Sequence, residues 1–259
     1  MYRGFEETRG KESAESVVVI ENLKKSFGNE VVLSNVSLKL FQGENLVVLG
    51  KSGSGKSVLI KCIVRLLAFD EGKINVLGYN IGELNNTDLG ELRKKVGFLF
   101  QSGALYDSMT VRQNLEFPLL RIRKELNRKE VDDKILEALE NVGLADALEK
   151  MPSQLSGGMR KRISLARTIV VDPSIMLYDE PTTGLDPVTS QEISVLINEV
   201  QKKYKTSSII ITHDIECARK TATRIVMLQD GAIYKEGSLT DFEKSDDALI
   251  KAFFMQSGT

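Results

Sequence analysis

The sequence has few of the residue types that mark disulfide-rich, zinc-binding or membrane-spanning chains. Among its 259 residues there are only two cysteines, Cys62 and Cys217, and one histidine. The cysteines lie far apart and form no CxxC pair, which argues against a disulfide framework or a zinc site and favours a reducing compartment. Apolar runs such as Val17–Ile20 and Ser208–Ile211 have strand length. They fall well short of the roughly 20 residues that span a bilayer.

The N-terminus and the net charge exclude further classes. Residues 1–15 are rich in Arg, Lys and Glu and have no apolar segment of signal-peptide length, so we expect a flexible tail and no secretion signal. The 35 basic and 36 acidic residues give a formal net charge of -1. That charge is too small to attract nucleic acid or anionic lipid over a long range, so any such partner would have to be recognised locally.

The apolar pattern predicts an α/β fold. Two strand-like segments, at residues 17–23 and 31–40, flank Gly28-Asn29 and predict an antiparallel hairpin. Short apolar runs at 46–49, 175–178, 208–212 and 225–228 are separated by helical stretches, which predicts a mostly parallel sheet with crossover helices. Residues 88–170 have charged helical patterns, for example at 128–142, and are predicted to be a helical insertion. Residues 241–259 are predicted to be a tail with a short amphipathic helix near 248–254, packed on the core or on a second copy.

A glycine-rich segment lies between the strand at 46–49 and residues 57–67, where apolar residues recur at helical spacing. This segment matches GxxxxGK[ST]. Its glycines allow successive backbone N–H groups to point inward at a helix N-terminus, which creates an anion site. Lys56 is expected to reach the β- and γ-phosphates of a nucleotide, and the Ser57 hydroxyl to coordinate Mg²⁺. A flexible Gly/Ser turn is the alternative. The expected nucleotide contacts are Gly50, Lys51, Ser52, Gly53, Ser54, Gly55, Lys56, Ser57 and Val58.

Two carboxylates follow the apolar strand at 175–178, and Pro181 ends its ladder. They therefore lie at the carboxyl end of a strand, where open α/β sheets place their ligands. Asp179 is expected to interact with the Mg²⁺ held by Ser57, and Glu180 to act as the general base that polarises the attacking water. The alternative is a solvated acidic turn.

His213 directly follows the predicted strand at 208–212. A lone histidine is often structural, but this position at a strand end of the same sheet would let it contact a γ-phosphate and position the water. Lys56, Glu180 and His213 are therefore the candidate catalytic residues.

A second candidate phosphate site occurs at Leu155-Ser156-Gly157-Gly158-Met159, before a predicted helix that runs to Ile169. This segment resembles the signature motif of ATP-binding cassette (ABC) proteins. Ser156, Gly157 and Gly158 would expose N–H groups at a helix N-terminus, although a simple capping role is the alternative. The resemblance implies that two copies pair head to tail, so that each signature closes on the nucleotide of the other copy.

The resemblance extends over residues 17–237 and implies an α/β P-loop NTPase fold, with a RecA-like, mostly parallel core, an N-terminal antiparallel β subdomain and an inserted helical subdomain. The ATPase domain would span residues 16–240. Phe27 resembles the aromatic residue that stacks on adenine, with a core role as the alternative. Gln101 resembles the glutamine that joins Mg²⁺ to the transmembrane partner, and 183–186, ending in Asp186, resembles the loop through which the two sites communicate. An ordinary loop residue and a plain turn are the respective alternatives. ATP and Mg²⁺ are thus the implied cofactors, with Ser57, Gln101 and Asp179 at the metal.

Two segments refine the resemblance. Residues 155–162, LSGGMRKR, have Met159 where the signature usually has glutamine, and residues 100–109 read FQSGALYDSM. Both resemble cassettes of the Mla/Mce-type phospholipid transport systems. The implied partners are a second copy, transmembrane permease subunits and an Mce-type substrate-binding protein, with the chain on the cytoplasmic face of the inner membrane. Another solute is the main alternative.

Two further classes of function remain as rivals. A soluble ABC ATPase acting on nucleic acid usually carries coiled coils, zinc modules or tandem cassettes, and none of these occurs here. The basic residues 160–162 are expected to form a solvated helix face and not to bind nucleic acid. A regulator that binds nucleotide without cleaving it is disfavoured by the presence of Glu180 and His213.

Overall fold

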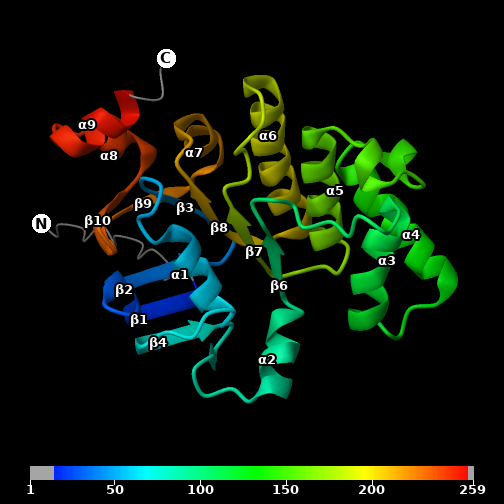
Figure 1. The fold of residues 1–259 in the computed structure, drawn as a ribbon, viewed down its shortest axis with the longest axis horizontal. Coiled ribbons are helices and arrows are strands. Elements are labelled where there is room, and N and C mark those ends of the chain that lie inside the picture. Colours follow the sequence, from blue (N-terminus) through cyan, green and yellow to red (C-terminus); the bar gives the residue numbers. More distant parts are fainter. Residues whose placement is uncertain (1–14, 256–259) are drawn as a thin grey trace, which may run out of the picture.

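The computed structural model describes residues 15–255, so the tail predicted at residues 1–15 lies outside this range apart from Glu15. A four-stranded antiparallel sheet has the order β2-β1-β4-β5 (Figure 1). Its strands are β1 (Ser16–Phe27), β2 (Glu30–Phe41), β4 (Glu71–Val76) and β5 (Tyr79–Asn80). The strands β1 and β2 form the predicted hairpin, and Gly28 in its turn has a φ of 58°.

A six-stranded sheet has the order β10-β9-β3-β8-β7-β6. Five of its strands are parallel, and only β10 runs antiparallel, beside β9. The predicted mostly parallel sheet is confirmed. Its strands are β3 (Asn45–Leu49), β6 (Val96–Leu99), β7 (Ile175–Asp179), β8 (Ser207–Thr212), β9 (Arg224–Gln229) and β10 (Ala232–Gly237).

The helices begin mostly at residues whose side chains accept hydrogen bonds from the first turn, which satisfies N–H groups that have no partner within the helix. Asn85, Thr110, Asn127, Ser156, Asp186 and Asp214 act in this way. The helices are α1 (Lys56–Ile63), α2 (Asn86–Arg93), α3 (Val111–Ile122), α4 (Arg128–Asn141), α5 (Gly157–Ile169), α6 (Pro187–Tyr204), α7 (Ile215–Thr221), α8 (Leu239–Glu243) and α9 (Ala248–Met255), with short 3-10 turns at Ala145–Ala147 and Pro152–Gln154.

The six-stranded sheet is covered on both faces, which explains why its central strands are continuously apolar. In β3, Val47 and Leu49 face one core together with residues of α3, α4, α5, α6 and α7. Leu46 and Val48 face the other core, which contains α1 and the antiparallel sheet. Figure 1 shows α1 between the two sheets and α5, α6 and α7 on the opposite side. Side chains alternate along a strand, so both faces of this sheet need apolar residues.

The structure corrects the expected secondary structure in three respects. Helix α1 ends at Ile63, short of the expected Leu67, because Arg65 has a φ of 51° and leaves the helical conformation. Residues 88–170, predicted to be a helical insertion, also contain β6, which pairs in parallel with β7 in the main sheet. The strands β4, β5 and β10 were not predicted, since they have few of the apolar residues that identify the buried strands.

A largely buried ion pair lies at the amino ends of β3 and β9 in the six-stranded sheet. Arg224 at the start of β9 donates from Nε to Glu44 Oε1 at 2.7 Å and from Nη2 to Glu44 Oε2 at 2.9 Å. Arg224 also contacts the carbonyl of Lys39 at 2.6 Å and the carboxylate of Glu236. One guanidinium therefore joins β2, the turn before β3, β9 and β10.

The predicted C-terminal helix is present as α9 and packs on the protein's own core. Ile250 and Phe253 are buried, and the rings of Phe242 and Phe254 stack with centroids 6.2 Å apart. Residues 256–259 lie outside the described range. No helix of the described part, residues 15–255, is long and apolar enough to cross a membrane.

Candidate active site

Four parallel strands of the sheet end at one edge, and each is followed by a residue that the sequence singled out. Strand β3 leads into Gly50, β7 ends at Asp179 with Glu180 directly after it, β8 is followed by His213, and β6 is followed two residues later by Gln101. Parallel strands have their carboxyl ends at the same edge, so residues far apart in sequence meet there.

The glycine-rich loop depends on Gly55 for its shape. Gly55 caps α1 with a φ of 95°, a left-handed conformation that side-chain-bearing residues rarely adopt. A Cβ at this position would lie 2.8 Å from the carbonyl oxygen of Val32 and 2.9 Å from Leu33 Cδ2. The loop is therefore pressed against the β1–β2 hairpin, and only glycine fits.

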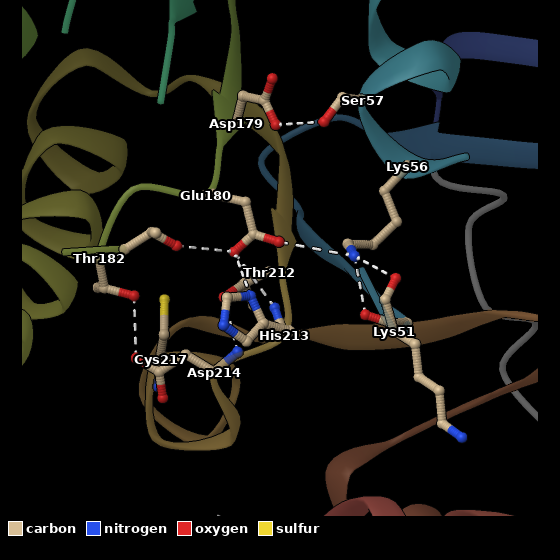
Figure 2. Close-up of polar contacts among 12 residues, drawn as sticks. Lys51, Lys56, Ser57, Asp179, Glu180, Thr182, Thr212, His213, Asp214 and Cys217 are labelled. Carbon is tan, nitrogen blue, oxygen red and sulfur yellow. Dashed lines mark hydrogen bonds and ion pairs between the residues drawn. The ribbon is translucent and has the colours of Figure 1, made fainter. Parts of the chain in front are cut away.

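The Lys56 side chain is buried and folded over the loop. Its Nζ donates to the carbonyl of Gly50 at 2.7 Å and to that of Lys51 at 3.0 Å, and it lies 3.6 Å from Glu180 Oε1 (Figure 2). Burial lowers the pKa of Lys56 below its usual range, while the negative charges of Glu180 and Asp179 oppose this shift. The ammonium is thus surrounded by oxygen atoms that a phosphate group could replace.

Ser57 and Asp179 form a direct contact. The Ser57 hydroxyl donates to Asp179 Oδ1 at 2.8 Å, which joins the start of α1 to the end of β7 (Figure 2). In residues 15–255 no group of three or more His, Cys, Asp or Glu side chains could hold a metal ion. A hydroxyl and one carboxylate suit Mg²⁺, which takes one or two protein ligands and completes its shell with water and substrate phosphates.

Glu180 lies at the centre of the site and has an unusual backbone conformation. Its φ is 49°, and its N–H donates to the carbonyl of Ile211 at 3.0 Å. For a residue with a side chain, this conformation costs of order 1–3 kcal/mol and is typical of functional sites. Its Oε2 lies 2.9 Å from Nδ1 of His213 and accepts from the His213 N–H and the Thr183 hydroxyl, each at 3.3 Å. The carboxylate therefore connects Lys56 on one side to His213 on the other.

A cavity of about 240 Å³ opens at this edge. Nine of the predicted residues line it, together with Val32, which sequence reasoning missed because its pattern indicates only a strand. The predicted lining residues are Ser52, Gly53, Gly55, Lys56, Ser57, Val58, Gln101, Glu180 and His213. The remaining loop residues, Gly50, Lys51 and Ser54, belong to the same turn but do not line the cavity. Asp179, which is bonded to Ser57, does not line it either.

Phe27 does not line the cavity, but it is not a core residue either. Its side chain is 47% exposed at the end of β1, in the hairpin whose second strand contacts the loop at Gly55. Lys25 Nζ lies 5.1 Å from the ring centroid. The core alternative is therefore excluded, and the predicted role in base stacking stays a prediction.

The second phosphate motif lies apart from the first within one chain. Ser156 caps α5, and its Oγ accepts from the Met159 N–H at 3.2 Å, while Ser156, Gly157 and Gly158 do not line the cavity. A Cβ on Gly158 would lie 2.5 Å from Thr189 Cγ2 at the start of α6. The signature segment thus packs beside the helix that Asp186 begins.

Asp186 has a clear structural role as the N-cap of α6. Its carboxylate accepts from the N–H groups of Val188 at 3.1 Å and Thr189 at 3.0 Å, and from the Thr189 hydroxyl at 2.6 Å. These bonds, the one from the Thr189 hydroxyl first, lower the pKa of Asp186. Its predicted role in communication between two sites stays a prediction.

One contact that the sequence did not predict joins residues close in sequence to the glutamate and the histidine. Thr182 Oγ1 donates to Asp214 Oδ2 at 2.9 Å, and Asp214 caps α7 directly after His213 (Figure 2). The turn after β7 is thereby tied to the turn after β8. Thr182 lies in no motif that would have indicated this contact.

The arrangement fits a nucleoside triphosphate with Mg²⁺. Helix α1 starts at the cavity, which provides partial positive charge, and Lys56 provides a full charge. Mg²⁺ would supply charge neutralisation at the phosphates, with Ser57 and Asp179 as its protein contacts.

Three curated relatives are similar to this chain over most of its length. The probable ribonucleotide transport ATP-binding protein mkl of Mycobacterium leprae is 38% identical over 91% of this chain and 68% of its own. The methionine import ATP-binding protein MetN of Clostridium tetani is 33% identical over 93% and 75% of the two chains. The chloroplastic protein TRIGALACTOSYLDIACYLGLYCEROL 3 of Arabidopsis thaliana is 34% identical over 96% and 77%.

A solved structure and a family model lead to the same assignment. The dimeric, post-hydrolysis structure of the ATP-binding cassette MJ0796 with ADP and Pi is 33% identical, with a TM-score of 0.77 over 86% of this chain and 98% of that one. The family model described as ABC transporter matches residues 33–183. The chain therefore belongs to the ABC transporter family, as an ATP-binding subunit that hydrolyses ATP with Mg²⁺.

Proposed function

We propose that this chain drives phospholipid transport of the Mla/Mce type through a separate permease. The observation that carries the proposal is that the two segments resembling such cassettes, residues 100–109 and 155–162, lie against each other. Lys161 of the second segment donates to the carbonyl of Gln101 in the first. A relative named for a galactolipid, from Arabidopsis thaliana, also supports a lipid cargo.

Within the site, the geometry supports the following proposed roles. Lys56 would leave the Gly50 and Lys51 carbonyls to bind the β- and γ-phosphates, and Ser57 and Asp179 would position Mg²⁺. Glu180 would accept the proton of the attacking water as general base, while His213, 2.9 Å from its carboxylate, would hold both in position.

We further propose that two copies share two nucleotides. Within one chain the residues of the signature segment do not line the nucleotide cavity, so a second copy could bring its Ser156, Gly157 and Gly158 to it. The MJ0796 cassette is dimeric in its solved structure. Asp186, beside the signature segment, would then lie near the contact between the copies.

Mixed dimers test this arrangement. One copy would carry Lys56→Ala, and the other Ser156→Arg together with Gly158→Val. If the sites are shared, the mixed dimer has one site with both halves intact, and it should recover turnover that neither variant shows alone. A mixed dimer as inactive as both parents, or a single copy as active as a pair, would refute the shared site.

The permease contact is proposed at a groove beside the Gln101 loop. Its lining includes Phe98, Phe100, Ala104, Tyr106, Phe117 and Arg167. The groove is partly aromatic, with Arg93, Lys94 and Thr168 also in its lining, and it borders the loop at the nucleotide cavity, so a helix end docked there would be close to Gln101. The chain would then be held at the cytoplasmic face of the inner membrane by the permease, with an Mce-type substrate-binding protein in the same complex.

Co-purification from membranes tests the partner and the cargo. The tagged chain should retain a permease, and Tyr106→Ser should reduce this retention more than Tyr79→Ser, because the two tyrosines are similarly exposed on different surfaces. The captured complex in liposomes should transfer labelled phospholipid with ATP, and Glu180→Gln should stop the transfer. A complex that moves only a soluble solute would refute the lipid assignment.

The second candidate function is transport of another solute by the same ATPase. The relatives named for methionine import and for ribonucleotide transport favour it. Stimulation of ATPase activity in the purified complex separates the two, since phospholipid should stimulate in the first case and amino acid or nucleotide in the second.

A further inference from the structure

Helix α5 presents one face to the loop that follows β6. Lys161, Ser164 and Arg167 lie three residues apart, so they form a row along one side of the helix. Each of these side chains contacts or closely approaches residues of the loop 101–104. The basic residues 160–162 were expected to form a solvated face, and this expectation was wrong for Lys161, which is buried, whereas Arg160 is exposed.

Lys161 is a buried cation with a specific partner. Lys161 is only 6% exposed, and its Nζ donates to the backbone carbonyl of Gln101. Within residues 15–255 this carbonyl is its only hydrogen-bond partner. Lysine is rarely buried unless it is paired, and a charge-assisted bond of this kind is among the stronger hydrogen bonds in proteins.

Arg167, six residues further along the helix, binds the next part of the loop. Its guanidinium donates to the carbonyl of Ala104 at 2.7 Å and to that of Gly103 at 3.4 Å. It also lies 5.7 Å from the ring centroid of Tyr106. Two cations on one helix therefore bind three carbonyl groups of a four-residue segment.

Between these two contacts the loop backbone rests directly on the helix. Gly103 has a φ of 77°, and a Cβ there would lie 2.7 Å from Ser164 Oγ. The Ser164 hydroxyl is itself fixed by its bond to the carbonyl of Arg160 at 2.7 Å. The loop thus has little freedom to move away from α5 without breaking these contacts.

We propose that Lys161 is a positioning residue that holds Gln101 at the nucleotide cavity through its backbone carbonyl and thereby sets how tightly the site retains Mg²⁺. The inference rests on the proposed role of Gln101 at the metal. Gln101 lines the cavity, whereas Lys161 does not, and the hydrogen bond of Lys161 reaches the site through the loop. The negative charges of Asp179 and Glu180 also act on Lys161, so the double variant below separates the two routes. Arg167 supports the same loop from its far end.

The test is the Mg²⁺ dependence of ATP hydrolysis in the full chain. Lys161→Met keeps most of the side-chain length and removes the donor. It should raise the Mg²⁺ concentration for half-maximal turnover roughly tenfold, as expected for one lost bond from a charged donor. Binding of ATP in EDTA should be unchanged, and Lys161→Arg should restore the Mg²⁺ dependence. Lys202→Met is the matched control, because Lys202 is exposed on α6.

Two further measurements separate this inference from the assignment of Gln101. Gln101→Ala should itself raise the Mg²⁺ requirement, and if it does not, the proposed role of Gln101 fails. If Gln101→Ala raises the requirement but a folded Lys161→Met variant behaves like Lys202→Met, the positioning role of Lys161 is refuted. Adding Lys161→Met to Gln101→Ala should have no further effect, and an additive effect would show that Lys161 acts elsewhere.

Amide hydrogen exchange provides a readout that does not depend on hydrolysis. In Lys161→Met the N–H groups of residues 101–104 should exchange faster, while those of α5 keep their protection. If both segments exchange faster together, the substitution has loosened the helix, and the specific role is refuted. Thermal unfolding of each variant confirms that the compared proteins are folded.

Discussion

Glu180→Gln is the substitution that most directly tests the proposed chemistry. Glutamine keeps the shape of the side chain but removes the base and the negative charge 3.6 Å from Lys56 Nζ. Loss of a general base reduces turnover by about 10² to 10⁴. This factor corresponds to about 3 to 5 kcal/mol of the barrier to hydrolysis.

The same substitution should leave nucleotide binding intact or make it tighter. In the structure the Glu180 carboxylate occupies the space between Lys56 and His213 and would repel the γ-phosphate. The amide carries no charge, so Lys56 is free to pair with phosphate. Turnover is therefore expected to fall while nucleotide binding is retained or becomes tighter, which distinguishes loss of the base from damage to the site.

Phosphate release with saturating MgATP measures turnover, and titration with a fluorescent ATP analogue measures binding. Glu199→Gln is the matched control, because Glu199 is exposed on α6 and far in sequence from the motifs. Hydrolysis at the normal rate by Glu180→Gln would show that another group is the base. Loss of both binding and turnover would show that Glu180 holds the loop in place and has no separate chemical role.

Three further predictions concern stability and access. Gly55→Ala would place a Cβ 2.8 Å from the Val32 carbonyl, so nucleotide binding should be lost and the free energy of unfolding should fall by about 1 to 3 kcal/mol. Gly43→Ala, at a φ of 70° with nothing within 4 Å, should retain binding, and equal behaviour of the two variants would contradict the packing argument. Arg224→Met leaves Glu44 buried and unpaired, and chemical denaturation should report a loss of about 3 to 5 kcal/mol; a loss no larger than that of Lys202→Met would contradict the ion-pair role. Burial raises the pKa of Cys62 to about 11 and of Cys217 to about 12. Both thiols therefore stay protonated at pH 8, and a thiol reagent should label them only after unfolding.

The phosphate loop and the catalytic carboxylates were predictable because each is defined by residues that are neighbours in the sequence. A strand, a glycine-rich turn and a helix follow one another at residues 45–63, so the phosphate loop could be read without any tertiary information. Asp179 and Glu180 could be predicted for the same reason, because they come directly after a continuously apolar run. Continuous burial on two faces produces the apolar runs that identified β3, β7, β8 and β9.

Other elements were missed because their signals are weak or depend on distant residues. Strand β6 has four residues and lies within a helical segment, and it is recognisable only by its pairing with β7. The burial of Lys161 was also hidden, since a lysine beside two arginines usually indicates a solvated face. Only the packing of the Gln101 loop on α5 gives that ammonium a partner.

The sequence by itself determined the α/β fold, the phosphate loop and the identity of the residues at the strand ends, because each depends on the order of neighbouring residues. The tertiary structure decided which of these residues share a cavity, and it brought Glu180 within 2.9 Å of His213 and 3.6 Å of Lys56. These contacts join segments separated by 33 to 124 residues along the chain, from positions 56, 180 and 213. Only the parallel order of the strands brings such segments to one edge.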